Sequence, residues 1–187
     1  GKILVPFAIE SALSGVGKSV GENNHLWYRK KFTIPAFMKG KNILLHFGAV
    51  DWEAEVFVNG KKAILHQGGY DPFSIDITSL IATGKEQEIL VRVWDPTDSG
   101  PQPIGKQKVK PSGIWYTPVT GIWQTVWIEA VTPTHIRDIY TVPDIDRSLI
   151  SIYPSLEKSN LGDQLKITIY DNGKKIHENS FKNDSVI

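Results

Sequence analysis

The stretch AEVFVNGKKAIL, residues 54–65, indicates how this chain folds. Side chains alternate between the two faces of a β-strand, so Ala54, Val56 and Val58 share one face. The Asn-Gly pair at 59–60 follows directly, and both of these residue types accept the positive φ angles that a two-residue hairpin turn needs. The stretch therefore predicts a β-hairpin with one apolar face.

Strand-like segments lie on both sides of this hairpin. They are LWYRKKFTI (26–34), NILLHFGAV (42–50), PFSIDIT (72–78), EILVRVWD (88–95) and GIWQTVWIEAV (121–131). The second and the last of them are apolar on both faces, which is typical of strands covered on both sides. SLIATG (79–84) predicts one short helical turn that Gly84 closes. Because helical periodicity of greater length is absent, the chain is predicted to be all-β, with the architecture of a sandwich.

The segment between the last two of these strands is irregular. PTDSGPQPIGKQKVKPSG, residues 96–113, contains four prolines and three glycines. A connection of this length inside a compact domain is usually functional or disordered. We therefore expect an irregular loop here that is either functional or disordered.

A second group of strands begins after Pro133. IRDIYTV, LISIYPSL and QLKITIYDNGKKIHENSF contain four candidate strands, and Asn172-Gly173 predicts a hairpin between the last two. The sequence thus predicts two domains, residues 1–132 and residues 133–187.

Composition excludes several classes of protein. A net charge of +1 over 187 residues gives no general attraction to nucleic acid or to an anionic membrane. No apolar run approaches the roughly 18 residues of a membrane-spanning helix. Cysteine is absent, which removes disulfides, zinc–thiolate sites and cysteine nucleophiles. These features leave the compartment open between cytoplasm and periplasm.

Motifs of catalysis are scarce. Glu53 and Glu55 are two residues apart on one strand face, as a glycosidase pair could be, but a solvated outer face opposite Ala54 explains them better. Asp95 and Asp98 could bind a cation with loop carbonyls, but turn and capping roles suit them better. The five histidines have no metal-ligand spacing, and none suggests a catalytic triad. We predict neither catalytic residues nor metal ligands in this chain.

Six phrases occur in one order along the chain: VPFAIESALSGVG, WYRKKFTIP, LLHFGAVDWEAEVFVNG, GGYDPFSIDIT, VRVWDPTDSGPQPIGKQ and GIWYTPVTGIWQTVWIE. Together they resemble the N-terminal sugar-binding domain of family 2 glycoside hydrolases, the β-galactosidase and β-glucuronidase group, over residues 5–131. Residues 134–187 are similar to the beginning of the immunoglobulin-like domain that follows in that family.

The resemblance implies a jelly-roll domain of the galactose-binding-like fold, followed by a partial immunoglobulin-like sandwich. It implies a retaining enzyme for β-linked sugars, whose acid/base and nucleophile glutamates lie in a downstream (β/α)₈ barrel against which the first domain packs. This chain would then be non-catalytic and without a cofactor, although a cation in the parent enzyme stays open. A free-standing carbohydrate-binding module and a structural spacer that binds no sugar are the alternatives.

Three candidate substrate-binding residues follow from the resemblance. PFAIESALSG matches a β-galactosidase segment that contacts the sugar, so Glu10 or Ser11 would inherit that contact, although the family's Asn-Pro is absent. The family's aspartate before the matching Trp is also absent, because Gly113 and Ile114 precede Trp115. This aspartate is the family's sodium-linked carboxylate, which is therefore missing here or supplied from elsewhere. Its absence argues against strict lactase-type specificity.

Three of the six tryptophans lie between residues 113 and 127. Trp123 and Trp127 fall on one strand face, and we assign them to the core or to the junction with a neighbouring domain. Trp115 precedes the strand in irregular sequence, so we expect it at a surface that faces sugar or the barrel.

The C-terminal segment has an apolar sheet face that needs a cover. An immunoglobulin-type sandwich requires about seven strands, and this segment supplies four candidates. Leu165, Ile167 and Ile169 alternate with polar residues. We therefore expect the segment to order on the first domain or to pair with a second copy of the chain as a homodimer.

Overall fold

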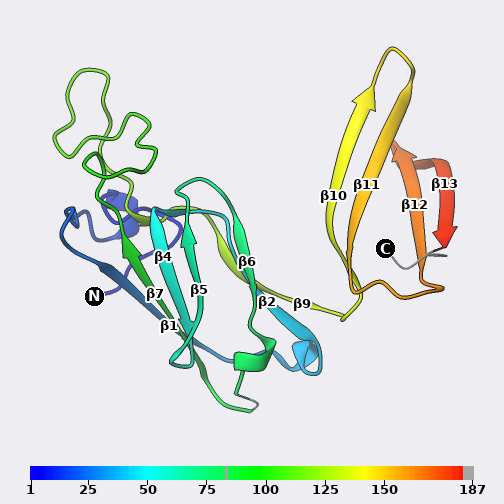
Figure 1. Ribbon diagram of the computed structural model, residues 1–187, viewed down its shortest axis with the longest axis horizontal. Coiled ribbons are helices and arrows are strands. Elements are labelled where there is room, and N and C mark those ends of the chain that lie inside the picture. The colour runs from blue at the N-terminus through cyan, green and yellow to red at the C-terminus, as the bar shows by residue number, and fades with distance from the viewer. Residues whose placement is uncertain (83, 183–187) are drawn as a thin grey trace. The chain divides into compact units, whose positions relative to one another are not determined.

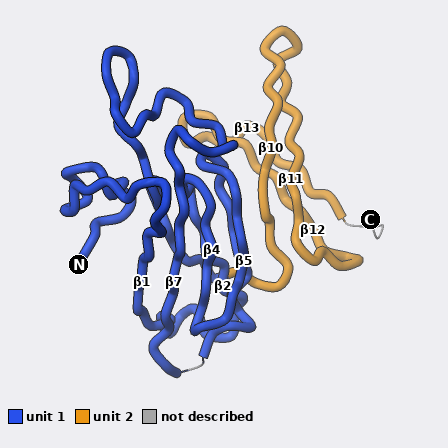
Figure 2. Tube along the Cα trace, turned by 60° about the vertical axis from the view of Figure 1, so that its left-hand side comes forward, with its two compact units in different colours: residues 1–130 blue, residues 131–187 orange. Residues whose placement is uncertain are grey.

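The computed structural model describes residues 1–82 and 84–182. The chain divides into two compact units (Figure 2), unit 1 at Gly1–Ala130 and unit 2 at Val131–Ile187. Three 3₁₀ turns are present, η1 (Ala12–Ser14), η2 (Ala36–Met38) and η3 (Thr78–Leu80), and the described residues contain no α-helix. The predicted all-β class is confirmed. The helical turn expected at 79–84 is the shorter η3, and Thr83 of that stretch lies outside the described residues.

The largest sheet of unit 1 has four antiparallel strands in the order β1-β7-β4-β5 (Figure 1). Their bounds are β1 (Leu26–Phe32), β7 (Gln87–Trp94), β4 (Glu53–Val58) and β5 (Lys61–Gln67). The hairpin predicted from the Asn-Gly pair joins β4 to β5, with φ angles of 50° at Asn59 and 78° at Gly60. Asn59 also donates from Nδ2 to the Leu80 carbonyl at 2.8 Å, which ties the turn to η3.

The facing sheet of unit 1 has the order β6-β2-β9, and β3 and β8 form a separate two-stranded sheet. The bounds are β6 (Phe73–Asp76), β2 (Asn42–Phe47), β9 (Val126–Val131), β3 (Val50–Asp51) and β8 (Gly121–Ile122).

Two of the strands predicted as continuous are each divided in two. The segment 42–50 forms β2 and β3, and 121–131 forms β8 and β9, because the two breaks lie against each other. Gly48 N donates to the Thr125 carbonyl at 2.9 Å, and a Cβ at Gly48 would lie 2.6 Å from Gln124 Cβ. Only glycine allows these two segments of the chain to approach this closely. The strands are therefore interrupted here, although the apolar pattern continues.

The core of unit 1 lies between the two larger sheets. Val56, Val58 and Val93 are fully buried, as is Leu45 at 1% exposure, and the rings of Phe47 and Phe73 stack at 4.8 Å. Burying one such side chain contributes roughly 1.5–3 kcal/mol. The inward residues of β4 and β7 alternate with partly exposed ones, as the strand pattern predicted.

Unit 2 consists of two antiparallel hairpins, β10 (His135–Asp144) with β11 (Leu149–Glu157), and β12 (Gln164–Asp171) with β13 (Lys174–Lys182). The four predicted strands are confirmed, and Asn172 and Gly173 make the expected turn with φ angles of 45° and 78°. No side chain from 131 to 182 is buried. Unit 2 thus has no closed core of its own within the described residues.

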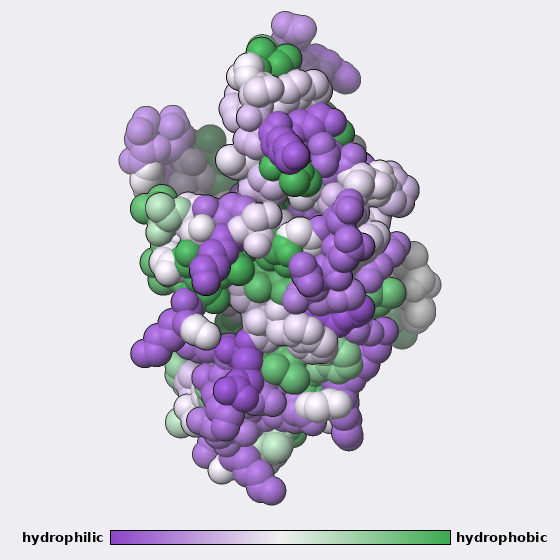
Figure 3. Space-filling view, turned by 90° about the vertical axis from the view of Figure 1, so that its left-hand side faces the viewer, coloured by the Kyte–Doolittle hydropathy of each residue, from purple (hydrophilic) through white to green (hydrophobic). Residues whose placement is uncertain are grey.

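The molecular surface is mixed in character. On the face drawn in Figure 3, apolar side chains form patches among hydrophilic ones. In the described residues, no helix has the length and apolarity needed to cross a membrane.

Candidate functional site

Three segments meet at one end of the strands of unit 1: the N-terminal segment with η1, the end of β3, and the connection from β7 to β8. The N-terminal segment and the connection lie near the upper ends of β1 and β7 in Figure 1. We call this connection, residues 95–120, the long loop. Hydrogen bonds from its two arms join it to the other two segments. This end of the unit is the candidate functional site.

Thr120 joins the loop to the N-terminal segment. It is 2% exposed, donates from its backbone N to Glu10 Oε2 at 3.0 Å, and donates from Oγ1 to Asp95 Oδ2 at 2.8 Å. The other oxygen of Asp95 accepts from Thr97 N at 2.7 Å, which supports the positive φ of 55° at Thr97. The predicted turn role of Asp95 is confirmed.

Gln107 joins the loop to β3. Its Nε2 donates to Asp51 Oδ2 at 2.9 Å, and its Oε1 accepts from Val119 N at 2.6 Å. Gly69 packs against the same carboxylate, since a Cβ there would lie 2.5 Å from Asp51 Oδ1. The Asp51 side chain is therefore enclosed by backbone on one side and by the loop on the other.

The three carboxyl groups at this end share a buried environment. Burial raises the pKa of Asp51 to about 6, against the hydrogen bond from Gln107 and with a smaller contribution from the negative charges of Asp95 and Glu10. Burial also raises the pKa of Glu10 and that of Asp95, although hydrogen bonds from the loop oppose this. These carboxylates act as acceptors that hold the loop, and their engaged oxygens do not face solvent as a catalytic pair would.

The two candidates from the N-terminal segment have different surroundings. Ser11 Oγ accepts from Leu13 N at 3.2 Å, so this hydroxyl caps η1. Glu10 Oε2 holds Thr120, while its buried Oε1 has no hydrogen-bond partner in the described part of the chain. A sugar contact from either residue stays a prediction.

Trp115 lies on the exposed tip of the long loop. It is 40% exposed, and Lys108 Nζ lies 5.2 Å from the centroid of its ring, a cation–π distance. Lys108 also pairs with Asp98 at 3.3 Å. The structure therefore brings Glu10 and Ser11 together at the base of the site, and it places Trp115 separately at the tip.

The other two tryptophans of this region have unequal burial. Trp123 is partly buried and donates from Nε1 to the Gly69 carbonyl at 2.8 Å. Trp127 is 43% exposed, so its assignment to the core is wrong. Because β9 turns Val126, Ile128 and Ala130 towards the core, Trp127 lies on the opposite face of the strand. A place for Trp127 at a junction with another domain stays a prediction.

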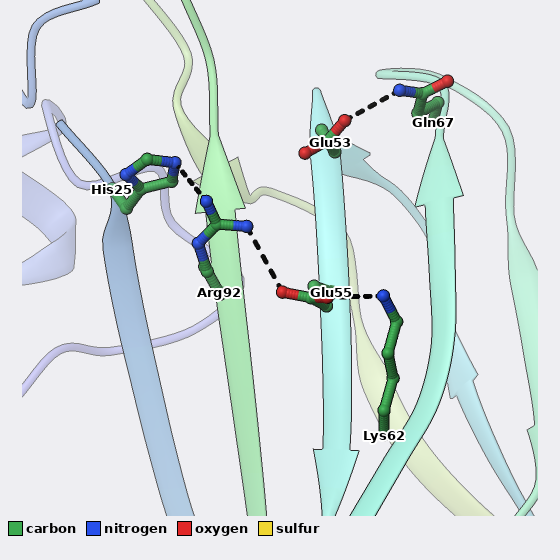
Figure 4. A network of polar contacts seen from close by, with 6 residues as sticks. All are labelled: His25, Glu53, Glu55, Lys62, Gln67 and Arg92. Atoms are coloured by element: carbon green, nitrogen blue, oxygen red, sulfur yellow. Dashed lines mark hydrogen bonds and ion pairs between the residues drawn. The ribbon is translucent and has the colours of Figure 1, made fainter. Parts of the chain in front are cut away.

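Glu53 and Glu55 lie on the outer face of the four-stranded sheet (Figure 4). Glu53 accepts from Gln67 Nε2 at 2.7 Å, and Glu55 pairs with Lys62 and, at 3.2 Å, with Arg92. The hydrogen bond from Lys62 lowers the pKa of Glu55. The pair is engaged in surface contacts, which confirms the interpretation as a solvated face.

One cluster could not be found from sequence spacing. His46 lies between Ser74 Oγ, at 2.7 Å from Nδ1, and Glu129 Oε2, at 3.1 Å from Nε2, and Trp127 stacks on its ring at 4.7 Å. The residues come from three neighbouring strands, 28 and 83 positions apart. Ser74 lies inside the regular strand β6 and not on the strained turn that exposes a nucleophilic serine. The hydrogen bonds from Ser74 and Glu129 therefore orient the His46 ring against Trp127.

In residues 1–82 and 84–182, no group of three or more His, Asp or Glu side chains could hold a metal ion. The oxygens of Asp95 are both engaged in hydrogen bonds, which agrees with this finding.

Two antiparallel sheets that enclose one core, with a long loop at one end, make unit 1 a β-sandwich domain. Residues 7–130 match the family described as glycosyl hydrolases family 2, sugar binding domain, and the chain belongs to this family.

Relatives of the chain carry the names of two activities. It is 35% identical over 120 residues to the β-galactosidase of Thermoanaerobacter pseudethanolicus, covering 63% of this chain and 15% of that protein. It is 32% identical over 129 residues to a β-glucuronidase of Formosa agariphila, covering 64% and 12%. The β-glucuronidase structure from Lactobacillus rhamnosus superposes with a TM-score of 0.71 at 20% identity, covering 95% of this chain and 31% of that one, and shows the shared fold. The chain thus spans less than a third of each of these proteins.

Proposed function

We propose that this chain is the non-catalytic N-terminal part of a retaining glycoside hydrolase that acts on a β-linked sugar. The observation that carries the proposal is the match of residues 7–130 to the sugar-binding domain of family 2. The similar proteins are named β-galactosidase and β-glucuronidase, so a β-galactoside or a β-glucuronide is the proposed substrate class.

The role of unit 1 in that enzyme is to shape the substrate pocket. A retaining glycosidase needs two carboxyl groups about 5–5.5 Å apart across an open cleft. Three carboxylates of unit 1 are engaged in other contacts: Glu55 in surface ion pairs, and Asp51 and Asp95 in the buried base of the long loop. We therefore assign the catalytic glutamates to a downstream barrel, and to Glu10, Ser11 and Trp115 a contact with the sugar.

Unit 2 is proposed to begin an immunoglobulin-like domain, with the first domain at 1–132 and the second from 133. Support comes from its two hairpins and from the exposure of apolar side chains such as Ile139, Leu149 and Ile176, at 54%, 41% and 60%. Such a surface favours pairing, and a homodimer through unit 2 is the form proposed for the isolated chain. Sedimentation of 1–187 and 1–132 across concentrations tests it, and two monomers at all concentrations would contradict it.

The central experiment measures turnover of nitrophenyl β-galactoside and β-glucuronide. We expect none from chain 1–187, and hydrolysis of at least one substrate by the longest reading frame that contains it. In the longer protein, Glu10→Gln and Trp115→Ala should lower kcat/KM without lowering the melting temperature, whereas Glu53→Gln, on the outer sheet face, serves as the control. Turnover by chain 1–187 that a substitution within it abolishes would refute the proposal.

A further inference from the structure

The long loop presents an apolar tip to solvent. Val109, Ile114 and Tyr116 are 48%, 69% and 65% exposed, and Trp115 lies among them. An irregular segment of this length loses much conformational entropy when it is ordered, so specific contacts must hold it.

Both ends of the loop are anchored in buried structure. At its start, Asp95 holds Thr97, and Gln102, 6% exposed, donates from Nε2 to the Thr97 carbonyl at 2.9 Å. At its end, Thr120 is fixed by Glu10 and Asp95. These contacts order the two ends but leave the tip unsupported.

A pair of backbone hydrogen bonds joins the two arms of the loop below the tip. Tyr116 N donates to the Lys106 carbonyl at 2.8 Å, and Lys108 N donates to the Tyr116 carbonyl at 2.9 Å. Gln107 is the residue between Lys106 and Lys108, so its side chain leaves the arms at the point where they meet. Trp115 and Lys108, which form the cation–π pair, belong to the same junction or directly adjoin it.

We infer that Gln107 is a positioning residue: its amide locks the two arms of the long loop to β3 and thereby holds the Trp115–Lys108 pair in place. Its side-chain nitrogen reaches Asp51 and its side-chain oxygen reaches Val119 N, so a single group connects the ascending arm, the returning arm and the sheet. That this order serves carbohydrate recognition rests on the proposed function, whereas the locking of the loop does not.

The residue type fits this task closely. The position requires a donor towards Asp51 and an acceptor towards Val119 N at the same time, and an amide offers both without charge. A glutamate would add a fourth carboxyl group beside those of Asp51, Glu10 and Asp95. An asparagine has one methylene fewer and would lose reach to one of its two partners.

Hydrogen exchange of chain 1–187, followed by mass spectrometry, tests the inference. In Gln107→Ala we expect the amides of Lys108, Tyr116 and Val119 to exchange at least about tenfold faster than in the wild type, with unchanged exchange in β4 and β7. Gln67→Ala is the matched control, because it also removes an amide that donates to a carboxylate, Glu53 at 2.7 Å, in an exposed contact that involves no residue of the loop. It should leave the loop amides unchanged.

Gln107→Glu adds a readout that a general loss of stability would not produce. At pH 5, the introduced carboxyl group can be protonated, and it can then still donate to Asp51 and accept from Val119 N. At pH 8 the introduced group is a carboxylate, which repels the carboxylates of Asp51, Asp95 and Glu10. Protection of the loop should therefore approach the wild type at pH 5 and match Gln107→Ala at pH 8.

Two results would overturn the inference. One is unchanged exchange across residues 105–120 in Gln107→Ala, and the other is equal acceleration in β4 and β7, which would make Gln107 a general stability residue. In the longer enzyme, Gln107→Ala and Trp115→Ala should lower kcat/KM by similar factors, and the double variant should lose little more. If the kinetic effects are absent while the loop amides exchange as expected, the proposed function is contradicted and the positioning role of Gln107 stands.

Discussion

Replacing Asp51 by Asn should stabilise unit 1, and increasingly so as the pH rises. Asp51 is 3% exposed, accepts a hydrogen bond from Gln107, and has the carboxyl groups of Asp95 and Glu10 near it. Its ordinary pKa is 3.8, and burial raises it to about 6 in the folded protein. Asparagine has a similar shape, retains an oxygen that can accept from Gln107, and carries no charge to desolvate.

The sign and magnitude follow from linkage between proton binding and folding. Because the pKa of Asp51 is higher in the folded state, the folded protein binds more protons between pH 3.8 and about 6, and its stability falls as the pH rises through this window. One pKa unit corresponds to about 1.4 kcal/mol, so the wild type loses roughly 2–3 kcal/mol on passing from acid to pH 7 or above. More than a third of this loss, about 1 kcal/mol, falls between pH 5 and pH 7.

Urea unfolding followed by tryptophan fluorescence measures this effect. All six tryptophans lie at or before residue 127, so the signal reports on unit 1. The stability difference between Asp51→Asn and wild type should grow by about 1 kcal/mol from pH 5 to pH 7. Asp71→Asn, which removes the same formal charge from an exposed side chain, is the control. A difference that stays constant with pH, or that shrinks as the pH rises, would refute the reasoning.

Two further substitutions test the packing of unit 1. Phe47→Ala should cost about 3–5 kcal/mol of unfolding free energy, as buried aromatic truncations do. Trp127→Ala should cost clearly less, because its side chain is half-exposed. Equal urea midpoints for the two variants would contradict the assignment of Phe47 to the core and of Trp127 to the surface. Gly121→Ala should lower the melting temperature by several degrees, since φ is 92° and the new Cβ would lie 2.0 Å from Tyr28 Oη; an unchanged melting curve would show that β8 can shift to accept it.

The strands were predictable because their signals are local. Alternation along β4 and β7, and the Asn-Gly turns after Val58 and Asp171, depend on neighbouring residues, and the structure has each of them. The break between β8 and β9 was not predictable in this way. It depends on Gly48, more than seventy positions earlier, whose missing side chain lets the two segments approach. The exposure of Trp127 was not predictable either, because the sequence places the residue on a strand but does not tell which face of that strand is covered.

The site was predictable only in part, for a related reason. The sequence marks residues 96–113 as an unusual loop, and the family resemblance points to Glu10, but neither indicates Asp51, Gln107 or Thr120. These three look like ordinary strand and loop residues until folding brings them to partners 56 and 110 positions away. A buried polar contact of this kind depends on tertiary neighbours and leaves no periodic signal in the chain.

The candidate site therefore divides its residues between two tasks. At the base, Glu10, Asp51 and Thr120 are engaged in partly or fully buried hydrogen bonds. Substitutions that remove an acceptor or a donor from these bonds should disorder the loop, whereas Asp51→Asn and Glu10→Gln retain an acceptor. At the tip, Trp115 and Tyr116 are exposed, so they can change without loss of buried packing. Buried carboxylates are costly to retain unless they hold something in place, and here they hold the loop that carries the tip. Under the proposed function, substitutions that change the preference among sugars should accordingly fall at the tip, while those that disorder the loop and reduce activity on all sugars should fall at the base.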